Sequence, residues 1–309
     1  MIIDLRMLAR QLIMNVLSFL PRNRQTKIER WLRGREDCRK LALADFVVVS
    51  FGKSGRTWLR VMLSRFYQVR YGLEERHLLA FDNLHAKSPA IPRILFTHDN
   101  YLADYNKNID KSHYYNKKVI LLVRDPADVA VSQYHQWKYR MSARKRRIND
   151  YPLDGETPLY DFVIRRHSGL PKVIDFLNQW ARELPRMRSI LVVRYEDMRA
   201  DPAKVLARIL DFLGSPGTPD EIRLSVEFAS VENMRKLEER RVFWLSGRRM
   251  LATDRSNPNT YKVRRAKVGG YRDDFTAEQL AVIDTMMATD VLAAFGYRRE
   301  ATAAGGVRP

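Results

Sequence analysis

Residues 46–63, FVVVSFGKSGRTWLRVML, constrain the fold of this chain more than any other stretch. A short β-branched run leads into a turn at residues 52–55, Gly-Lys-Ser-Gly, and a helical pattern begins near Thr57. A glycine-bounded turn between a strand and a helix N-terminus makes backbone N–H groups converge at the positive end of the helix dipole. Lys53 adds a mobile positive charge, and Ser54 and Thr57 add hydroxyl groups. The segment therefore predicts a phosphate-binding loop.

The loop departs from the nucleoside-triphosphate P-loop. The Walker pattern G-x-x-x-x-G-K-[ST], closed by Gly52-Lys53-Ser54, requires glycine at position 47. That position is Val47, in the middle of the predicted strand. A nucleotide-phosphate-binding kinase is thus an alternative that Val47 disfavours, and a plain strand-to-helix turn is the alternative without chemistry.

Further apolar runs alternate with helical patterns along the chain. Short buried strands are predicted at 94–97, 119–123 and 190–193. Helices are predicted at 127–139, within 159–184, at 202–213 and at 276–295. This alternation predicts a single α/β domain of three layers, P-loop-like, with a central parallel sheet between helices. Lys53, His98 and Arg124 follow the carboxyl ends of three strands, where open parallel sheets bind ligands.

The chain is strongly basic, with a net charge of +19 over 309 residues. Such a surplus attracts nucleotides, sulfated or phosphorylated glycans, nucleic acid or an anionic membrane surface. Basic residues gather at 140–157 and 235–272, and we expect these segments to border the entrance for an acceptor. A basic module that binds membrane or nucleic acid without catalysis is therefore an alternative from a different class.

Residues 1–44 are predicted to form an N-terminal amphipathic helical segment. Apolar residues recur at helical spacing between positions 5 and 20, and Arg22, Arg24 and Lys27 follow them. The apolar patch is too short to span a bilayer, and Asp4 argues against a signal peptide. The segment either docks on the domain, predicted at 45–298, or lies on a membrane surface. Residues 299–309 are predicted to be a disordered tail.

Cysteine usage is minimal. The single Cys38 excludes an intrachain disulfide, which fits a reducing compartment and a cytoplasmic location. The sequence shows no zinc-type cluster of Cys and His, so we predict no metal.

Three blocks resemble the sulfotransferases of the cytosolic type, which use 3′-phosphoadenosine 5′-phosphosulfate (PAPS) as donor; a bacterial member is expected. The block FGKSGRTW is similar to the family's P-K-S-G-T-T-W loop, with Gly52 in place of proline and Arg56 in place of the first threonine. The resemblance implies that Lys53 contacts the 5′-phosphate and the bridging oxygen, and that Trp58 stacks on adenine. The loop residues implied to bind the donor are Lys53, Ser54, Gly55, Arg56, Thr57 and Trp58.

The other two blocks imply a second phosphate site. LLVRDPADVAVSQYH is similar to the family's 3′-phosphate motif and implies contacts from Arg124 and Ser132. VRRAKVGGYRDDF is similar to R-K-G-x-x-G-D-W-K and implies that Arg264 and Arg265 close over the same phosphate. Ala266 stands at a backbone-contact position where the family has glycine.

Two single residues extend the resemblance. His98, in FTHDN, aligns with the catalytic histidine of the family's K-T-H segment, whose lysine is replaced here by Phe96. Tyr195, in RYEDM, aligns with a tyrosine on the adenine side of the donor, and Val231 replaces an adenine-stacking phenylalanine.

The resemblance implies sulfuryl transfer from PAPS to a hydroxyl or amine, leaving adenosine 3′,5′-bisphosphate (PAP), without a metal. His98 is the implied general base, and Lys53 the cation at the leaving oxygen. The acceptor is expected to be a small molecule, a glycan or a lipid. One further expectation is peripheral contact with the inner face of a membrane through the N-terminal helix and the basic surface. Nucleic acid is not expected as a partner.

Overall fold

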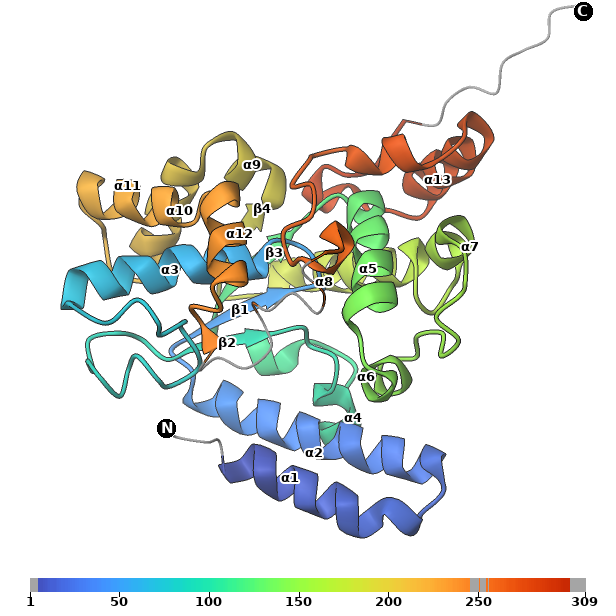
Figure 1. Ribbon diagram of the computed structural model, residues 1–309, viewed down its shortest axis with the longest axis horizontal. Helices are drawn as coiled ribbons and strands as arrows, with labels where there is room; N and C mark the ends of the chain where they lie inside the picture. The colour runs from blue at the N-terminus through green and yellow to red at the C-terminus, as the bar shows by residue number, and fades with distance from the viewer. Residues whose placement is uncertain (1–4, 245–249, 251–253, 255, 301–309) are drawn as a thin grey trace, which may run out of the picture.

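The computed structural model describes residues 5–244, 250, 254 and 256–300 (Figure 1). At its centre is a parallel sheet of four strands in the order β2-β1-β3-β4. The strands are β1 (Phe46–Ser50), β2 (Ile94–Thr97), β3 (Lys118–Val123) and β4 (Ser189–Arg194). Val48 of β1 is in register with Phe96 of β2 and Ile120 of β3. The four predicted strands and their parallel arrangement are confirmed.

The two faces of the sheet bury two separate cores, because successive side chains of a strand point to opposite faces. Val47 and Val49 of β1 pack in one core, while Phe46 and Val48 pack in the other. The first core includes α5 (Pro126–Arg140), α8 (Leu170–Glu183) and α13 (Ala277–Thr289). The second includes α3 (Arg56–Tyr71), α10 (Pro202–Phe212) and α12 (Val231–Glu239). The predicted three-layer α/β/α architecture is confirmed.

Helix ends follow local capping signals. The predicted capping box at the start of α13 is present, with Thr276 as N-cap and Gln279 at the third position. This helix ends at Thr289, earlier than the predicted 295, and a short 3₁₀ turn covers Ala293–Phe295. The loop expected at 140–157 contains α6 (Ala143–Ile148), because the hydroxyl of Ser142 caps its N-terminus.

The remaining helices are α1 (Leu5–Val16), α2 (Arg22–Leu43), α4 (Leu102–Asn106), α7 (Leu159–Ile164), α9 (Tyr195–Ala200) and α11 (Pro219–Phe228). In Figure 1 the hairpin of α1 and α2 lies below β2 and α4.

Helix α2 packs closely against α4. A Cβ added to Gly34 would lie 2.8 Å from the Cβ of Tyr105 and closer still to the carbonyl oxygen of Tyr101. Arg30 Nε donates to Asp104 at 2.9 Å, and the rings of Trp31 and Tyr105 lie 5.4 Å apart. The absence of a side chain at position 34 therefore allows the two segments to touch.

Helix α1 carries an exposed apolar stripe. Leu12, Val16 and Phe19 are 66%, 71% and 77% exposed, and their spacing places them along one side of the α1 region. Among the described residues, no helix has both the length and the hydropathy needed to cross a membrane.

At the other end of the chain, Arg299 pairs with Asp125 and Asp284, one residue past the expected domain boundary. Residues 301–309 of the expected tail lie outside the described residues.

Candidate active site

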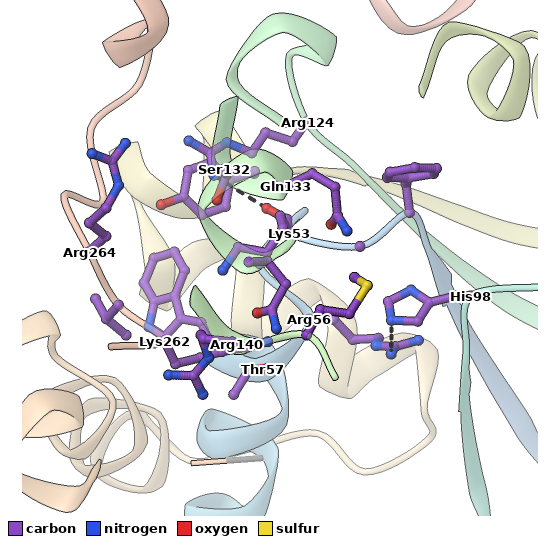
Figure 2. Close-up of a pocket in the computed structure, with 18 of the residues that line it drawn as sticks. Lys53, Arg56, Thr57, His98, Arg124, Ser132, Gln133, Arg140, Lys262 and Arg264 are labelled. Carbon is purple, nitrogen blue, oxygen red and sulfur yellow. Dashed lines mark hydrogen bonds between the residues drawn. The ribbon is translucent and has the colours of Figure 1, made fainter. Parts of the chain in front are cut away.

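A cavity of about 1290 Å³ opens at the carboxyl end of the sheet. The segment that follows each strand contributes to its lining, with Lys53 after β1, His98 after β2, Arg124 after β3 and Tyr195 after β4. Parallel strands bring these four positions to the same edge, although they are far apart in sequence. Figure 2 shows the first three side chains around the cavity.

The turn at residues 52–55 leads directly from β1 into α3, as the sequence predicts. Gly55 is the N-cap of α3 with φ 92°, and a Cβ there would lie 2.7 Å from Cδ2 of the Tyr195 ring. Glycine is therefore required both by the backbone and by the ring. Arg56, Thr57 and Trp58 open the helix and line the cavity, as does Lys53. Ser54 is buried and is not part of the lining.

Lys53 brings an uncompensated charge into the cavity. Its carbonyl oxygen accepts a hydrogen bond from Arg124 Nη1 at 3.3 Å, which ties β1's turn to β3. In the part of the chain that the structure describes, no carboxylate pairs with its ammonium group. Burial, followed by the charges of Lys262, Arg140 and Arg124, lowers the pKa of Lys53 well below its usual 10.5. Such a site favours an anionic ligand.

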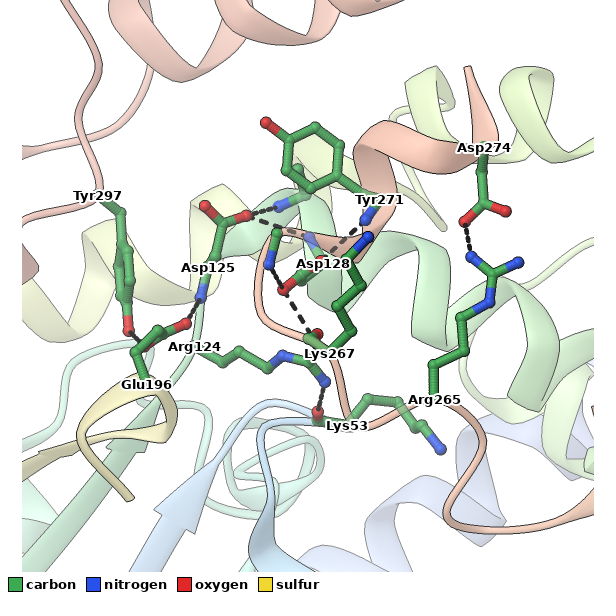
Figure 3. Close-up of polar contacts among 12 residues, drawn as sticks. Lys53, Arg124, Asp125, Asp128, Glu196, Arg265, Lys267, Tyr271, Asp274 and Tyr297 are labelled. Atoms are coloured by element: carbon green, nitrogen blue, oxygen red, sulfur yellow. Dashed lines mark hydrogen bonds and ion pairs between the residues drawn. The ribbon is translucent and has the colours of Figure 1, made fainter. Parts of the chain in front are cut away.

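Asp128 joins the second and third sequence blocks (Figure 3). Its buried carboxylate accepts hydrogen bonds from the backbone N–H groups of Gly269, at 2.8 Å, and Tyr271, at 3.1 Å. It also pairs with Arg124 at 3.3 Å. The sequence reasoning missed Asp128. Acidic residues are common in the first turn of a helix, where they interact favourably with the helix dipole. The sequence around Asp128 therefore does not indicate its contacts with the distant third block.

The third block reaches the cavity through several residues, including the two arginines singled out in the sequence. Arg264, Arg265 and Ala266 all line it, and Ser132 of α5 lines it too. Arg265 also pairs with Asp274 at 3.1 Å, which Figure 3 shows. Ala266 has φ 54°, the left-handed conformation in which glycine costs less.

Aromatic side chains form one end of the site. Trp58 Nε1 donates to the carbonyl oxygen of Ala229 at 2.8 Å, which fixes the indole ring. The Tyr195 ring lies edge-on to Trp58 with centroids 6.0 Å apart, and the Arg124 guanidinium lies 4.3 Å from the centroid of Tyr195. Val231 also lines the cavity. This end offers flat apolar surfaces beside a cation.

His98 is held in one tautomer. Its Nδ1 lies 2.8 Å from the carbonyl oxygen of Ser50, which can only accept, so Nδ1 carries the proton. Its Nε2 is then the acceptor for Arg56 Nη2, 2.5 Å away. Burial, followed by the charge of Arg56 and then those of Lys262 and Arg60, lowers the pKa of His98 well below 6.5. The imidazole is therefore neutral, as a general base must be.

Lys262 is a further cation at the site that sequence reasoning did not single out. The buried carboxylate of Glu238 accepts from the Lys262 backbone N–H at 3.0 and 2.8 Å and pairs with Arg140 at 2.9 Å. Burial, then Arg140 and Arg56, lowers the pKa of Lys262 to about 7. Lys262 and Arg140 are drawn near Lys53 in Figure 2. Only the tertiary contact with Glu238 distinguishes this lysine from its many basic neighbours.

Beyond His98, residues of α2 and of the segment after α6 line the rest of the cavity. The guanidinium groups of Arg30 and Arg33 each lie 5.7 Å from the centroid of the Tyr101 ring. Tyr101 donates to Asn149 Oδ1 at 2.8 Å, and Lys172 Nζ donates to the Asn149 carbonyl at 2.6 Å. Burial lowers the pKa of Lys172 to about 8. The segment 140–157 was expected to border this end, whereas the contributions of α2, Tyr101 and Lys172 were not predicted from the sequence.

Among the described residues, no group of three or more His, Cys, Asp or Glu side chains is placed to hold a metal ion.

Known proteins resemble the chain over most of its length. The family model for the sulfotransferase domain matches residues 43–296. Cytosolic sulfotransferase 10 of Arabidopsis thaliana is 25% identical over 276 residues, covering 79% of this chain and 77% of the relative. Flavonol 3-sulfotransferase of Flaveria bidentis is 24% identical over 259 residues, covering 79% and 80% of the two chains.

Solved structures share the fold. Mouse sulfotransferase SULT7A1, complexed with PAP, superposes with a TM-score of 0.56 at 22% identity, over 82% of this chain and 89% of that one. Retinol dehydratase, complexed with androsterone and PAP, gives 0.53 at 18% identity, over 84% and 87%. With the family model covering most of the chain, this protein belongs to the sulfotransferase family and is a sulfotransferase enzyme.

Proposed function

We propose that this sulfotransferase transfers the sulfuryl group of PAPS to a hydroxyl or amine of a polar, anionic acceptor. The observation that carries the proposal is the pairing of Lys53 and His98 at neighbouring strand ends in one cavity. Lys53 is half-buried and has no carboxylate partner among the described residues, its pKa is lowered, and the imidazole of His98 is neutral. Lys53 can stabilise the charge that develops on the leaving oxygen, and His98 can take the proton of the acceptor group.

The donor fits between the two cationic groups of the cavity. The turn around Gly55, with Lys53, Arg56 and Thr57, offers N–H groups and cations for the phosphosulfate. The second phosphate is assigned to Arg124, Ser132, Arg264, Arg265 and the backbone of Ala266. Trp58 and Tyr195 hold the adenine. Support comes from the uncompensated cations here and from the PAP present in the SULT7A1 and retinol dehydratase complexes.

In the transfer, Nε2 of His98 takes the proton from the acceptor group as its oxygen or nitrogen attacks sulfur. The bond from sulfur to the bridging oxygen breaks, and its electron pair stays on that oxygen as PAP leaves. Lys53 stabilises the charge that develops there. The cavity supplies orientation by fixing both reactants at one edge of the sheet.

The acceptor end favours a hydroxylated or amino compound that carries an anionic group, as glycans and lipid headgroups do. Lys172 is desolvated there and donates to the carbonyl oxygen of Asn149, and Arg30 and Arg33 line the same wall. Arg30, Arg33 and Asp37 of that wall come from α2, and all three precede the matched family region. The names of two relatives mention a flavonol and retinol, which are less polar acceptors.

We further propose a cytoplasmic enzyme that touches the inner face of a membrane through α1. The exposed side chains of Leu12, Val16 and Phe19 would enter the interface, and the exposed Arg22 and Arg24 would face anionic headgroups.

The proposed function is tested by ligand stabilisation and by sulfuryl transfer. PAP at 100 times its Kd should stabilise the folded state by about 2.7 kcal/mol, while ATP should have a smaller effect. A larger shift with magnesium ATP would favour a kinase, and no shift with PAP would overturn the proposal. Transfer from labelled PAPS is then measured against glycans, lipids and neutral sterols. His98→Ala should abolish transfer while keeping the shift with PAP.

A further inference from the structure

Arg56 is the first residue of α3, directly after the turn at Gly55. Its guanidinium points along the loop to the imidazole of His98, as Figure 2 shows, and Nη2 lies 2.5 Å from Nε2. The loop that is assigned to the phosphosulfate therefore also contacts the atom that is assigned to the acceptor's proton.

We propose that Arg56 is a reversible cap on the base: its guanidinium covers Nε2 of His98 until the sulfuryl group of the donor draws it away. The base then becomes available only when the donor is in place. This inference rests on the proposed function, because it takes His98 as the base and PAPS as the donor.

The geometry requires such an exchange. Because Nδ1 of His98 donates to Ser50, the imidazole has a single lone pair in the ring plane, at Nε2. Arg56 occupies that lone pair. An acceptor hydroxyl cannot give its proton to the same atom until the guanidinium has moved.

The donor offers the guanidinium a better partner. The bond to His98 joins a charged guanidinium to a neutral ring, whereas an anionic oxygen adds charge attraction and frequently pairs with arginine through two parallel bonds. Arg56 is one residue from Gly55 and lines the same cavity as Lys53, so the sulfuryl oxygens would lie within reach of its side chain. During transfer, Arg56 would then stabilise the sulfuryl group, and the acceptor's proton would go to the uncovered Nε2.

Groups other than Arg56 also influence the pKa of His98. Arg60, also on α3, and Lys262, from the segment before α13, both act on the imidazole, and the Ser50 carbonyl of β1 accepts from it. Replacing Arg56 therefore removes the neighbouring charge that lowers the pKa of His98 most and leaves the other charges in place. A neutral His98 is needed for activity, so activity falls as the pH drops through its pKa. Loss of Arg56 raises that pKa and moves the acidic limb to higher pH.

The experiment compares Arg56→Thr, Arg56→Lys and Arg65→Thr by the pH dependence of kcat/KM. Arg65 lies on the same helix and pairs with Glu75, so it serves as the control. In Arg56→Thr we expect the acidic limb to move up by about one pH unit and kcat to fall by about 10²-fold. Without donor, diethyl pyrocarbonate should modify His98 faster in this variant than in the wild type, as read by peptide mass spectrometry.

Arg56→Lys should recover part of kcat. The shift in melting temperature with PAP verifies that each variant is folded.

The outcomes separate the two proposals. If His98→Ala keeps full transfer activity, His98 is not the base, and the proposal that Arg56 caps the base is overturned as well. If His98→Ala is inactive but Arg56→Thr leaves the acidic limb, kcat and His98 modification unchanged, only the cap is overturned. If Arg65→Thr produces the same shift as Arg56→Thr, the effect is one of general charge, and the cap is likewise overturned.

Discussion

The ring of Tyr195 packs directly on Gly55, so closely that a Cβ on the glycine would lie 2.7 Å from Cδ2 of the ring. The two residues are brought together because β1 and β4 end at the same edge of the sheet, on either side of β3. This contact sets the turn against the aromatic end of the cavity. A side chain at position 55 must therefore displace either the turn or the ring.

Gly55→Ala is expected to lower the free energy of unfolding by about 1–3 kcal/mol and to abolish the stabilisation by PAP. Gly72→Ala is the matched control, because Gly72 also has a positive φ, 61°, but has no atom within 4 Å of its added Cβ. Urea unfolding with and without PAP measures both effects. Equal loss of PAP stabilisation in the two variants would contradict a specific role for the contact with Tyr195.

Gly34→Ala tests whether α2 forms the acceptor wall. Alanine normally stabilises a helix interior by about 1 kcal/mol relative to glycine. Here the new Cβ would collide with the backbone at Tyr101, so we expect destabilisation and a raised KM for the acceptor. PAP affinity should stay close to wild type, because the donor residues lie on other elements. Lys27→Ala, on the exposed surface of α2, is the control. An unchanged acceptor KM would remove α2 from the site.

Ala266→Gly should stabilise the protein. Ala266 has φ 54°, and a non-glycine residue in this conformation costs roughly 1–2 kcal/mol. Relief of that strain should raise the free energy of unfolding by about 1 kcal/mol. Ala281→Gly in the exposed middle of α13 should have the opposite sign, at about 1 kcal/mol. Chemical denaturation of both variants decides the matter, and a loss in Ala266→Gly would show that the strain is absent.

PAP binding should take up protons near pH 7–8. In the free protein, burial and neighbouring cations lower the pKa of Lys53 well below 10.5 and that of Lys262 to about 7. Lys262 is therefore partly neutral in this range, and the lowered pKa of Lys53 also favours its neutral form. An anionic ligand favours their charged forms, raises both pKa values and draws protons from the buffer.

Calorimetry in buffers of different ionisation enthalpy measures that uptake. Lys262→Met should reduce it, while Lys236→Met, on the exposed surface of α12, should leave it unchanged. Net proton release on binding would contradict the assignment of these lysines to the phosphate site.

The strands and the turn at residues 52–55 could be predicted because their signals are local. β-branched runs bounded by turns mark β1 and β3, and the glycine turn directly precedes α3. The convergence of Lys53, His98 and Arg124 then follows from parallel pairing alone.

The rest of the site depends on contacts that no local pattern reports. Arg56 and His98 are 42 residues apart, and their hydrogen bond requires the register between β1 and β2. Lys262 stands out from its basic neighbours only through the buried Glu238 that holds its backbone. The role of Arg30 depends on Gly34, whose missing side chain reads in the sequence merely as a poor helix former.

The strand order also places the proposed donor side and the proposed acceptor side of the cavity on different parts of the sheet. In the described sheet, β2 has a strand neighbour on one side only, and it carries His98 and the acceptor end. The proposed donor residues Lys53, Arg124 and Tyr195 follow β1, β3 and β4, which are neighbours in the sheet. Helices laid against the β2 border can thus be exchanged in evolution, or grafted in the laboratory, to admit new acceptors without disturbing nucleotide recognition.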